Sequence, residues 1–211
     1  MTPMATHTLR GTLVLSALLL TGAARPAGRV SGPPKSVAVF AGGCYWGVES
    51  VYRHVLGVKS VTSGFALGAG EPAPPPGAQD HDEIAEAVRV EYDSTQVSYD
   101  QLLQIFFSVV HDPTQGDRQG PDVGHRYRSA LYTMNPGQKE AAEAYLAKLK
   151  EGKAYSRPIT TVVYPLRKFS AAPNEQQNFA ERHPDEPYIR INDVPKIAAL
   201  KAQFGALYRE R

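Results

Sequence analysis

A short apolar run that ends in two glycines constrains the fold of this chain more than any other feature. Residues 37–40 are apolar and partly β-branched, which predicts a buried strand, and Gly42 and Gly43 permit a sharp turn after it. From Cys44 onward, apolar residues recur at the spacing of an amphipathic helix: Val48, Val51, Tyr52 and Val55. The sequence therefore predicts a strand, a tight turn and a helix, with Cys44 where the helix begins.

Strand and helix patterns alternate along the rest of the chain. Further strands are predicted at residues 59–65, 87–92, 128–133 and 159–164, and helices at residues 99–110 and 136–150. The Pro-rich stretch 66–83 predicts a long surface loop, and a last helix is expected after Pro195. We therefore predict an α/β (α+β) fold. It is a two-layer sandwich of a mixed sheet and packed helices, with a ferredoxin-like core and an irregular C-terminal tail.

Length and charge narrow the classes of protein. A chain of 211 residues suits one buried core rather than two domains. The formal net charge is +2 and the basic residues form no run, so nucleic-acid binding has no electrostatic support. The sequence shows no nucleotide-binding glycine loop and no metal-ligand spacing, so we expect neither a bound cofactor nor a metal. We expect a monomer.

The first residues have the layout of a secretory signal peptide. Arg10 precedes an uncharged apolar stretch, residues 11–24, that ends in small residues. We therefore predict a signal peptide at 1–24, a linker at 25–35 and a single catalytic domain at 36–211, with export to the periplasm or another extracytoplasmic space. A buried terminal helix and an uncleaved anchor are the alternatives.

Cys44 is the only cysteine, so no internal disulfide can form. At a helix N-terminus, free backbone N–H groups and the helix dipole stabilise a thiolate, which predicts a lowered pKa for Cys44. Tyr45 and Trp46 follow at once and can form an apolar pocket for a small group. The alternative is that Cys44 is a small core residue and that both aromatic residues are packing.

Several motifs occur in an order that resembles the A-type methionine sulfoxide reductases. The signature of that family is Gly-Cys-Phe-Trp-Gly, and residues 43–47 read Gly-Cys-Tyr-Trp-Gly. The later motifs are Ala-Glu-Ala-Val from residue 85, His-Asp-Pro-Thr from 111, Arg-Gln-Gly-Pro-Asp-Val-Gly from 118 and Tyr-Arg-Ser-Ala from 127. Several motifs in the same order are far more specific than one alone.

The resemblance implies reduction of the S epimer of methionine sulfoxide, free or in proteins. Cys44 would attack the sulfoxide sulfur, and Glu86 would donate a proton to the sulfoxide oxygen. Tyr127 would hydrogen-bond that oxygen, Asp122 would orient the site, and the two aromatic residues after the cysteine would hold the methyl group. Taken singly, Glu86 could be a solvated carboxylate, Asp122 a turn former and Tyr127 a core residue.

Two other classes of function stay open at this stage. A cysteine hydrolase would pair the thiol with one of four histidines: His54, His111, His125 or His183. An exported binding module without catalytic activity would use only the aromatic pocket. The hydrolase gives no role to Glu86, and a Cys44 thiolate with a lowered pKa would argue against the binding module.

Three departures from the family pattern bear on the site and its recycling. The loop at 66–83 lacks the tyrosine that many members carry there, and Gln176-Gln177 stands where His-Gln is usual. The tail has no cysteine, since Tyr188 is followed by Ile189. A sulfenic acid on Cys44 would therefore have no partner within the chain. It would need an external thiol donor, such as a thioredoxin-like protein.

Overall fold

The computed structural model describes Met1 and residues 35–72 and 84–211. The predicted signal peptide and nearly all of the linker lie outside the described residues, as does most of the Pro-rich loop. Contacts within the chain separate residues 1–31 from residues 32–211, and the second unit contains every described element. Among the described residues, no helix is long and apolar enough to cross a membrane.

Five strands form one mixed sheet. They are β1 (Lys35–Gly42), β2 (Val58–Gly68), β3 (Ala85–Asp93), β6 (Ser129–Thr133) and β7 (Val162–Ala171). β3 pairs antiparallel with β1 and β2, β6 pairs antiparallel with β1, and β7 pairs parallel with β6 and antiparallel with β2. The order β1-β3-β2-β7-β6 therefore returns to β1. Two further short strands form a separate hairpin, β4 (Arg118–Gln119) and β5 (Asp122–Val123).

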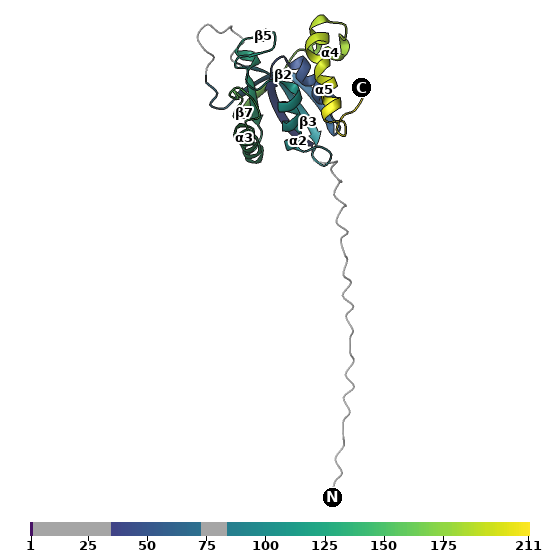
Figure 1. Ribbon diagram of the computed structural model, residues 1–211. Helices are drawn as coiled ribbons and strands as arrows, with labels where there is room; N and C mark the ends of the chain where they lie inside the picture. The colour runs from purple at the N-terminus through teal and green to yellow at the C-terminus, as the bar shows by residue number, and fades with distance from the viewer. Residues whose placement is uncertain (2–34, 73–83) are drawn as a thin grey trace. The chain divides into compact units, whose positions relative to one another are not determined.

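Helices flank the sheet, as Figure 1 shows. They are α1 (Tyr45–Arg53), α2 (Tyr99–Ile105), α3 (Pro136–Glu151), α4 (Phe179–Arg182) and α5 (Val194–Gln203). Sequence signals set two of the starts: Ser98 and Gln101 form a capping box before α2, and the Asn135 side chain caps α3. α2 continues into a π-helical turn, η1 (Phe106–Val110), so the predicted helix 99–110 is confirmed in extent.

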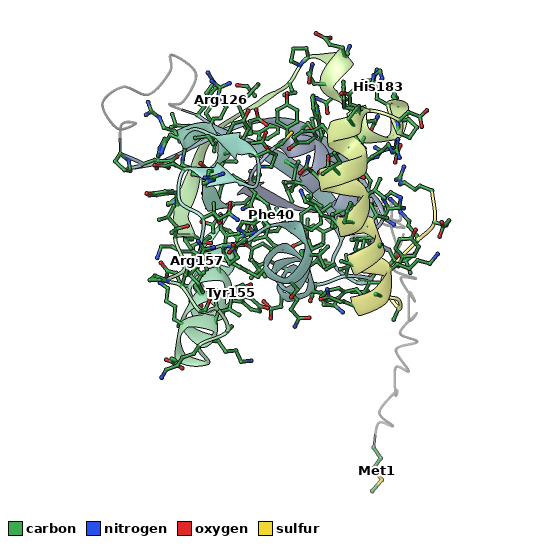
Figure 2. The ribbon with its side chains drawn as sticks, turned by 45° about the horizontal axis from the view of Figure 1, so that its top comes forward. Met1, Phe40, Arg126, Tyr155, Arg157 and His183 are labelled. Atoms are coloured by element: carbon green, nitrogen blue, oxygen red, sulfur yellow. The ribbon has the colours of Figure 1, made fainter. Side chains whose placement is uncertain are left out.

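The two faces of β1 contribute to two different apolar clusters. Ala38 and Phe40 belong to the larger cluster beneath the helices, and Phe40 lies at its centre in Figure 2. Val39 and Ala41 belong to a smaller cluster of seven buried residues, five of which are alanines. Small side chains take up little room on this face, which fits a sheet whose pairing returns to its first strand and leaves little space inside.

Three sequence predictions need correction. The start of the predicted loop 66–83 is wrong, because Ala66 pairs with Phe169 and Gly68 with Leu166 within the sheet. The last strand begins at Val162 and extends to Ala171, beyond the predicted 159–164, because β2 offers it a second partner. The tail is also less irregular than expected, since it holds α4 and two short helical turns, η3 (Asn174–Gln176) and η4 (Ile189–Asp193).

Candidate active site

Cys44 lies between β1 and α1, as the sequence predicts. Gly43 before it has a φ of +93°, in the region that favours glycine. A Cβ atom on Gly43 would lie 2.6 Å from Cβ of Gln119. Gln119 cannot easily yield, because its side-chain amide bonds the backbone N–H and C=O of Asp112 at 3.1 and 3.0 Å. The turn that presents the thiol therefore requires glycine for both its conformation and its space.

The thiol of Cys44 is half-buried, and its environment differs from the prediction. Burial raises the pKa of Cys44, the negative charge of Glu86 raises it further, and only the backbone N–H of Trp46 opposes them. The prediction that the helix N-terminus lowers the pKa of Cys44 is therefore wrong for the protein without substrate. Removal of the thiolate from water outweighs the one backbone N–H, that of Trp46, that favours the thiolate.

Glu86 is a buried carboxylate on β3 that reaches the start of α1. Its side chain is 8% exposed, and its Oε2 accepts a hydrogen bond from the backbone N–H of Tyr45 at 3.2 Å. Burial raises the pKa of Glu86 to about 7, against the lowering effects of that hydrogen bond and of Arg126. Glu86 is therefore not the solvated carboxylate of the simpler interpretation. It holds a proton near neutral pH, which suits a general acid.

Tyr127 and Asp122 both interact electrostatically with Glu86. Tyr127 ends the 3-10 turn η2 (His125–Tyr127), and burial, followed by the charges of Glu86 and Asp122, raises its pKa to about 12. Its phenol therefore stays protonated and can donate a hydrogen bond. Asp122, on β5, contributes to raising the pKa values of Cys44 and Glu86 as well. The four predicted catalytic residues thus come together from four separate segments.

The C-terminal tail completes an aromatic cluster around Trp46. The Trp46 ring stacks on Phe179 with centroids 3.9 Å apart, and its edge meets Tyr188 at 5.7 Å. Its Nε1 donates to Oε1 of Gln176 at 3.1 Å, and the Tyr45 hydroxyl donates to the same oxygen at 3.3 Å. The rings of Tyr45 and Trp46 thus lie edge to face, with centroids 6.4 Å apart, and share one hydrogen-bond acceptor in the tail.

Sequence reasoning missed the roles of three tail residues in this cluster: Gln176, Phe179 and Tyr188. The Tyr188 hydroxyl donates to Oδ2 of Asp122 at 2.5 Å, which joins the tail to the β4–β5 hairpin. Gln176 and Tyr188 appeared in the sequence only as departures from a family pattern. More than 100 residues separate the tail from Trp46, so no local spacing could reveal the contact.

Within the described segments, the four histidines bond or pack against groups other than the thiol of Cys44. His54 bonds the Ser50 carbonyl oxygen, and His125 bonds Asp117. His111 bonds the hydroxyl of Ser129, and burial lowers its pKa to about 4. The fourth, His183, packs against the Phe179 ring. This arrangement does not support a Cys-His hydrolase.

The site defines a thiol enzyme with a carboxylic acid and a phenol as proton or hydrogen-bond donors. Residues 36–207 match the family model described as peptide methionine sulfoxide reductase. A relative from Mesorhizobium japonicum, peptide methionine sulfoxide reductase MsrA 2, is 44% identical over 183 residues, covering 85% of this chain and 92% of the relative. A protein of the same name from Synechocystis is 43% identical over 172 residues, covering 80% and 79%.

Solved structures give the same result. Methionine sulfoxide reductase A of Corynebacterium diphtheriae is 33% identical, with 72% of this chain and 77% of that chain covered and a TM-score of 0.57. The reduced form of Mxr1 from Saccharomyces cerevisiae is 29% identical, with 71% and 86% covered and a TM-score of 0.57. The mixed α/β fold is similar to these structures. The chain belongs to the peptide methionine sulfoxide reductase family.

The raised pKa of Cys44 can be tested by alkylation without substrate. Because burial and Glu86 oppose ionisation, the rate of reaction with iodoacetamide should keep rising beyond pH 9, the ordinary pKa of the thiol. Glu86→Gln removes the second cause and should lower the apparent pKa, whereas Glu140→Gln, an exposed carboxylate on α3, should not. A plateau below pH 8 in the wild type would instead support the helix-stabilised thiolate.

Proposed function

We propose that this chain reduces the S epimer of methionine sulfoxide, free or in proteins, to methionine, and so repairs oxidised proteins. Family membership supports the reaction. The observation that supports the assignment of residues is the hydrogen bond between buried Glu86 and the backbone N–H of Tyr45, next to Cys44. It puts a carboxyl group with a pKa of about 7 beside the only cysteine in the chain.

The proposed reaction removes the oxygen and transfers two electrons. The sulfur of Cys44 attacks the sulfoxide sulfur while Glu86 delivers a proton to the sulfoxide oxygen, which is otherwise a poor leaving group. Tyr127 donates a hydrogen bond to the same oxygen, and Asp122 orients the site. The bond between the substrate sulfur and oxygen breaks, the oxygen leaves as water, and a sulfur–sulfur bond joins Cys44 to the substrate as a sulfonium. Water then attacks the sulfur of Cys44 and the sulfur–sulfur bond breaks, which releases the thioether and leaves Cys44 as a sulfenic acid.

The proton on Glu86 has a second use. Negative charge on Glu86 is the second cause, after burial, that raises the pKa of Cys44. When Glu86 is protonated, that repulsion is absent, and Cys44 loses its proton more readily. The same protonation state therefore provides the acid and eases formation of the nucleophile. Tyr45 and Trp46 would then hold the methyl group of the substrate.

We further propose that an external thiol returns Cys44 to its reduced state. The donor thiol attacks the sulfenic acid, water leaves, and a second thiol breaks the mixed disulfide. Cys44 is the only cysteine, which supports this route. A thioredoxin-like protein has both thiols and is the donor class that we favour. All of the proposed catalytic residues lie in one copy of the chain, which supports function as a monomer.

The nucleophile and the recycling route are testable together. Without reductant, wild-type enzyme should release one methionine per chain from the S epimer, and Cys44 should gain one oxygen in mass. Cys44→Ser should release none, because no other sulfur of that type is present. Two methionines per chain, or equal reduction of both epimers, would refute the scheme.

The pH profile of single-turnover kcat/KM tests Glu86. Below pH 7 the protonated fraction of Glu86 is constant and the Cys44 thiolate fraction rises, so kcat/KM should rise with pH. Above about 7 Glu86 loses its proton while the thiolate still increases, so the profile should level off. Glu86→Gln should be about 10²–10⁴-fold slower at neutral pH and should lack this break. If the break near pH 7 persists in Glu86→Gln, the titrating group is not Glu86.

The finer description of the fold is also a proposal. In the order β6-β1-β3-β2, every neighbouring pair is antiparallel, and α1 and α2 follow β1 and β3 in the chain. This arrangement supports a ferredoxin-like core. β7 adds to both outer strands of that core, which supports a barrel-like closure.

Export is proposed from the sequence alone. Arg10, the uncharged stretch 11–24 and the Pro/Gly-rich residues after it support a cleaved signal peptide and a periplasmic or other extracytoplasmic location. Intact mass spectrometry of protein from the native cell should then find a chain that begins near Ala24 or Arg25. A mass that still includes residues 1–24 would contradict cleavage.

A further inference from the structure

Gln176 meets both aromatic residues of the proposed methyl pocket through one atom. Its Oε1 lies 3.1 Å from Nε1 of Trp46 and 3.3 Å from the hydroxyl of Tyr45. An indole nitrogen can only donate, so the amide must face Trp46 with its oxygen. That oxygen has two lone pairs, and the two donors occupy both. One side chain from the tail therefore holds two residues of α1.

The position of Gln176 is fixed independently of the aromatic residues. The amide of the next residue, Gln177, bonds both backbone groups of Ser63 on β2 at 2.9 Å. The backbone N–H of Asn178 donates to buried Glu49 on α1 at 2.9 Å, and Glu49 also accepts from the Ser63 hydroxyl. Asn178 has a φ of +54°, so the chain turns sharply there. These contacts anchor the tail to β2 and α1 immediately after Gln176.

Ring contacts and one hydrogen bond together hold Trp46. Its ring stacks on Phe179, nearly parallel at 9°, and meets Tyr188 edge to face. The hydrogen bond from Nε1 to Gln176 fixes the direction in which the nitrogen edge of the indole points. Tyr45 meets Phe65 edge to face at 5.9 Å, and its hydroxyl bond to Gln176 similarly sets the direction of the ring.

The hydrogen-bonding capacities of the partners match. Tyr45 and Trp46 offer one donor each, and the amide oxygen of Gln176 accepts both. A neutral imidazole has one acceptor nitrogen and could accept from only one of the two donors. The hydroxyl of Tyr45 therefore suits a glutamine at 176 and would lose its partner with a histidine.

We propose that Gln176 is a positioning residue that sets substrate affinity by fixing the two aromatic walls of the methyl pocket, and that it acts as a coupled pair with Tyr45. The proposal rests on the proposed function of the site. It assigns specificity for a methyl-bearing sulfoxide to the tail as well as to the segment that carries the nucleophile.

The test compares Gln176→Leu, Gln176→His, Tyr45→Phe and the double variant Tyr45→Phe/Gln176→His. Gln203→Leu, the same change at an exposed position on α5, is the matched control. Trp46 is the only tryptophan, so intrinsic fluorescence reports on this residue alone. Each protein is assayed for emission without substrate and for KM and kcat with S-methionine sulfoxide and dithiothreitol.

Gln176→Leu should shift the Trp46 emission and raise KM about 3- to 10-fold, the effect of one to two lost hydrogen bonds, with a smaller change in kcat. Gln176→His should raise KM as well, and adding Tyr45→Phe should reverse part of that rise, because the unpaired hydroxyl is gone. Gln203→Leu should match the wild type in both measurements.

Two results would overturn the proposal while the wild type remains active. One is an unchanged KM and emission in Gln176→Leu. The other is strictly additive effects of Tyr45→Phe and Gln176→His, which would show that the pair is not coupled. If Gln176→Leu fails to fold, the histidine variants still decide, since they retain a polar side chain. Absence of turnover in the wild type would refute the proposed function itself.

Discussion

The hydrogen bond from the backbone N–H of Tyr45 to Glu86 is the contact on which the rest of the site depends. It joins Tyr45, the first residue of α1, to Glu86 on β3, which comes 41 positions later in the chain. Burial strongly favours the neutral acid, and this one N–H donor, together with Arg126, keeps the pKa of Glu86 near 7 rather than higher. The balance leaves a carboxyl group that can give up a proton at neutral pH. It also places that group where its charge controls the adjacent thiol.

The parts of the site that the sequence could predict are those written in local patterns. The apolar run, the glycine pair and the helical spacing predict the turn at Cys44. Alternation predicts a strand at 87–92, and β3 begins two residues earlier, so that it includes Glu86. The direction of the Cys44 pKa shift was wrong for a physical reason. The helix dipole can be inferred from neighbours in the chain, but burial depends on which distant segments cover the thiol.

The same reason explains why the sequence predicts an irregular tail. Its polar and charged residues show no period, because its role is to make specific contacts with α1 and β2 rather than to present one apolar face. Family motifs identified Asp122 and Tyr127, whose local context alone favoured a turn and a core position. They could not identify Tyr188 as the partner of Asp122, since that contact joins two segments 66 positions apart.

The lone cysteine also changes what the tail must do during a catalytic cycle. A tail that carries a resolving thiol has to travel to the oxidised cysteine, so it must be held loosely enough to let go. Here Glu49 and Gln177 anchor the tail through partly buried hydrogen bonds, and no step of the proposed cycle requires those bonds to break. The conformational entropy of the tail is therefore lost once, during folding, and not again at each encounter with substrate. Such a tail can be preorganised as part of the binding site, with the motion between the two half-reactions transferred to the partner protein.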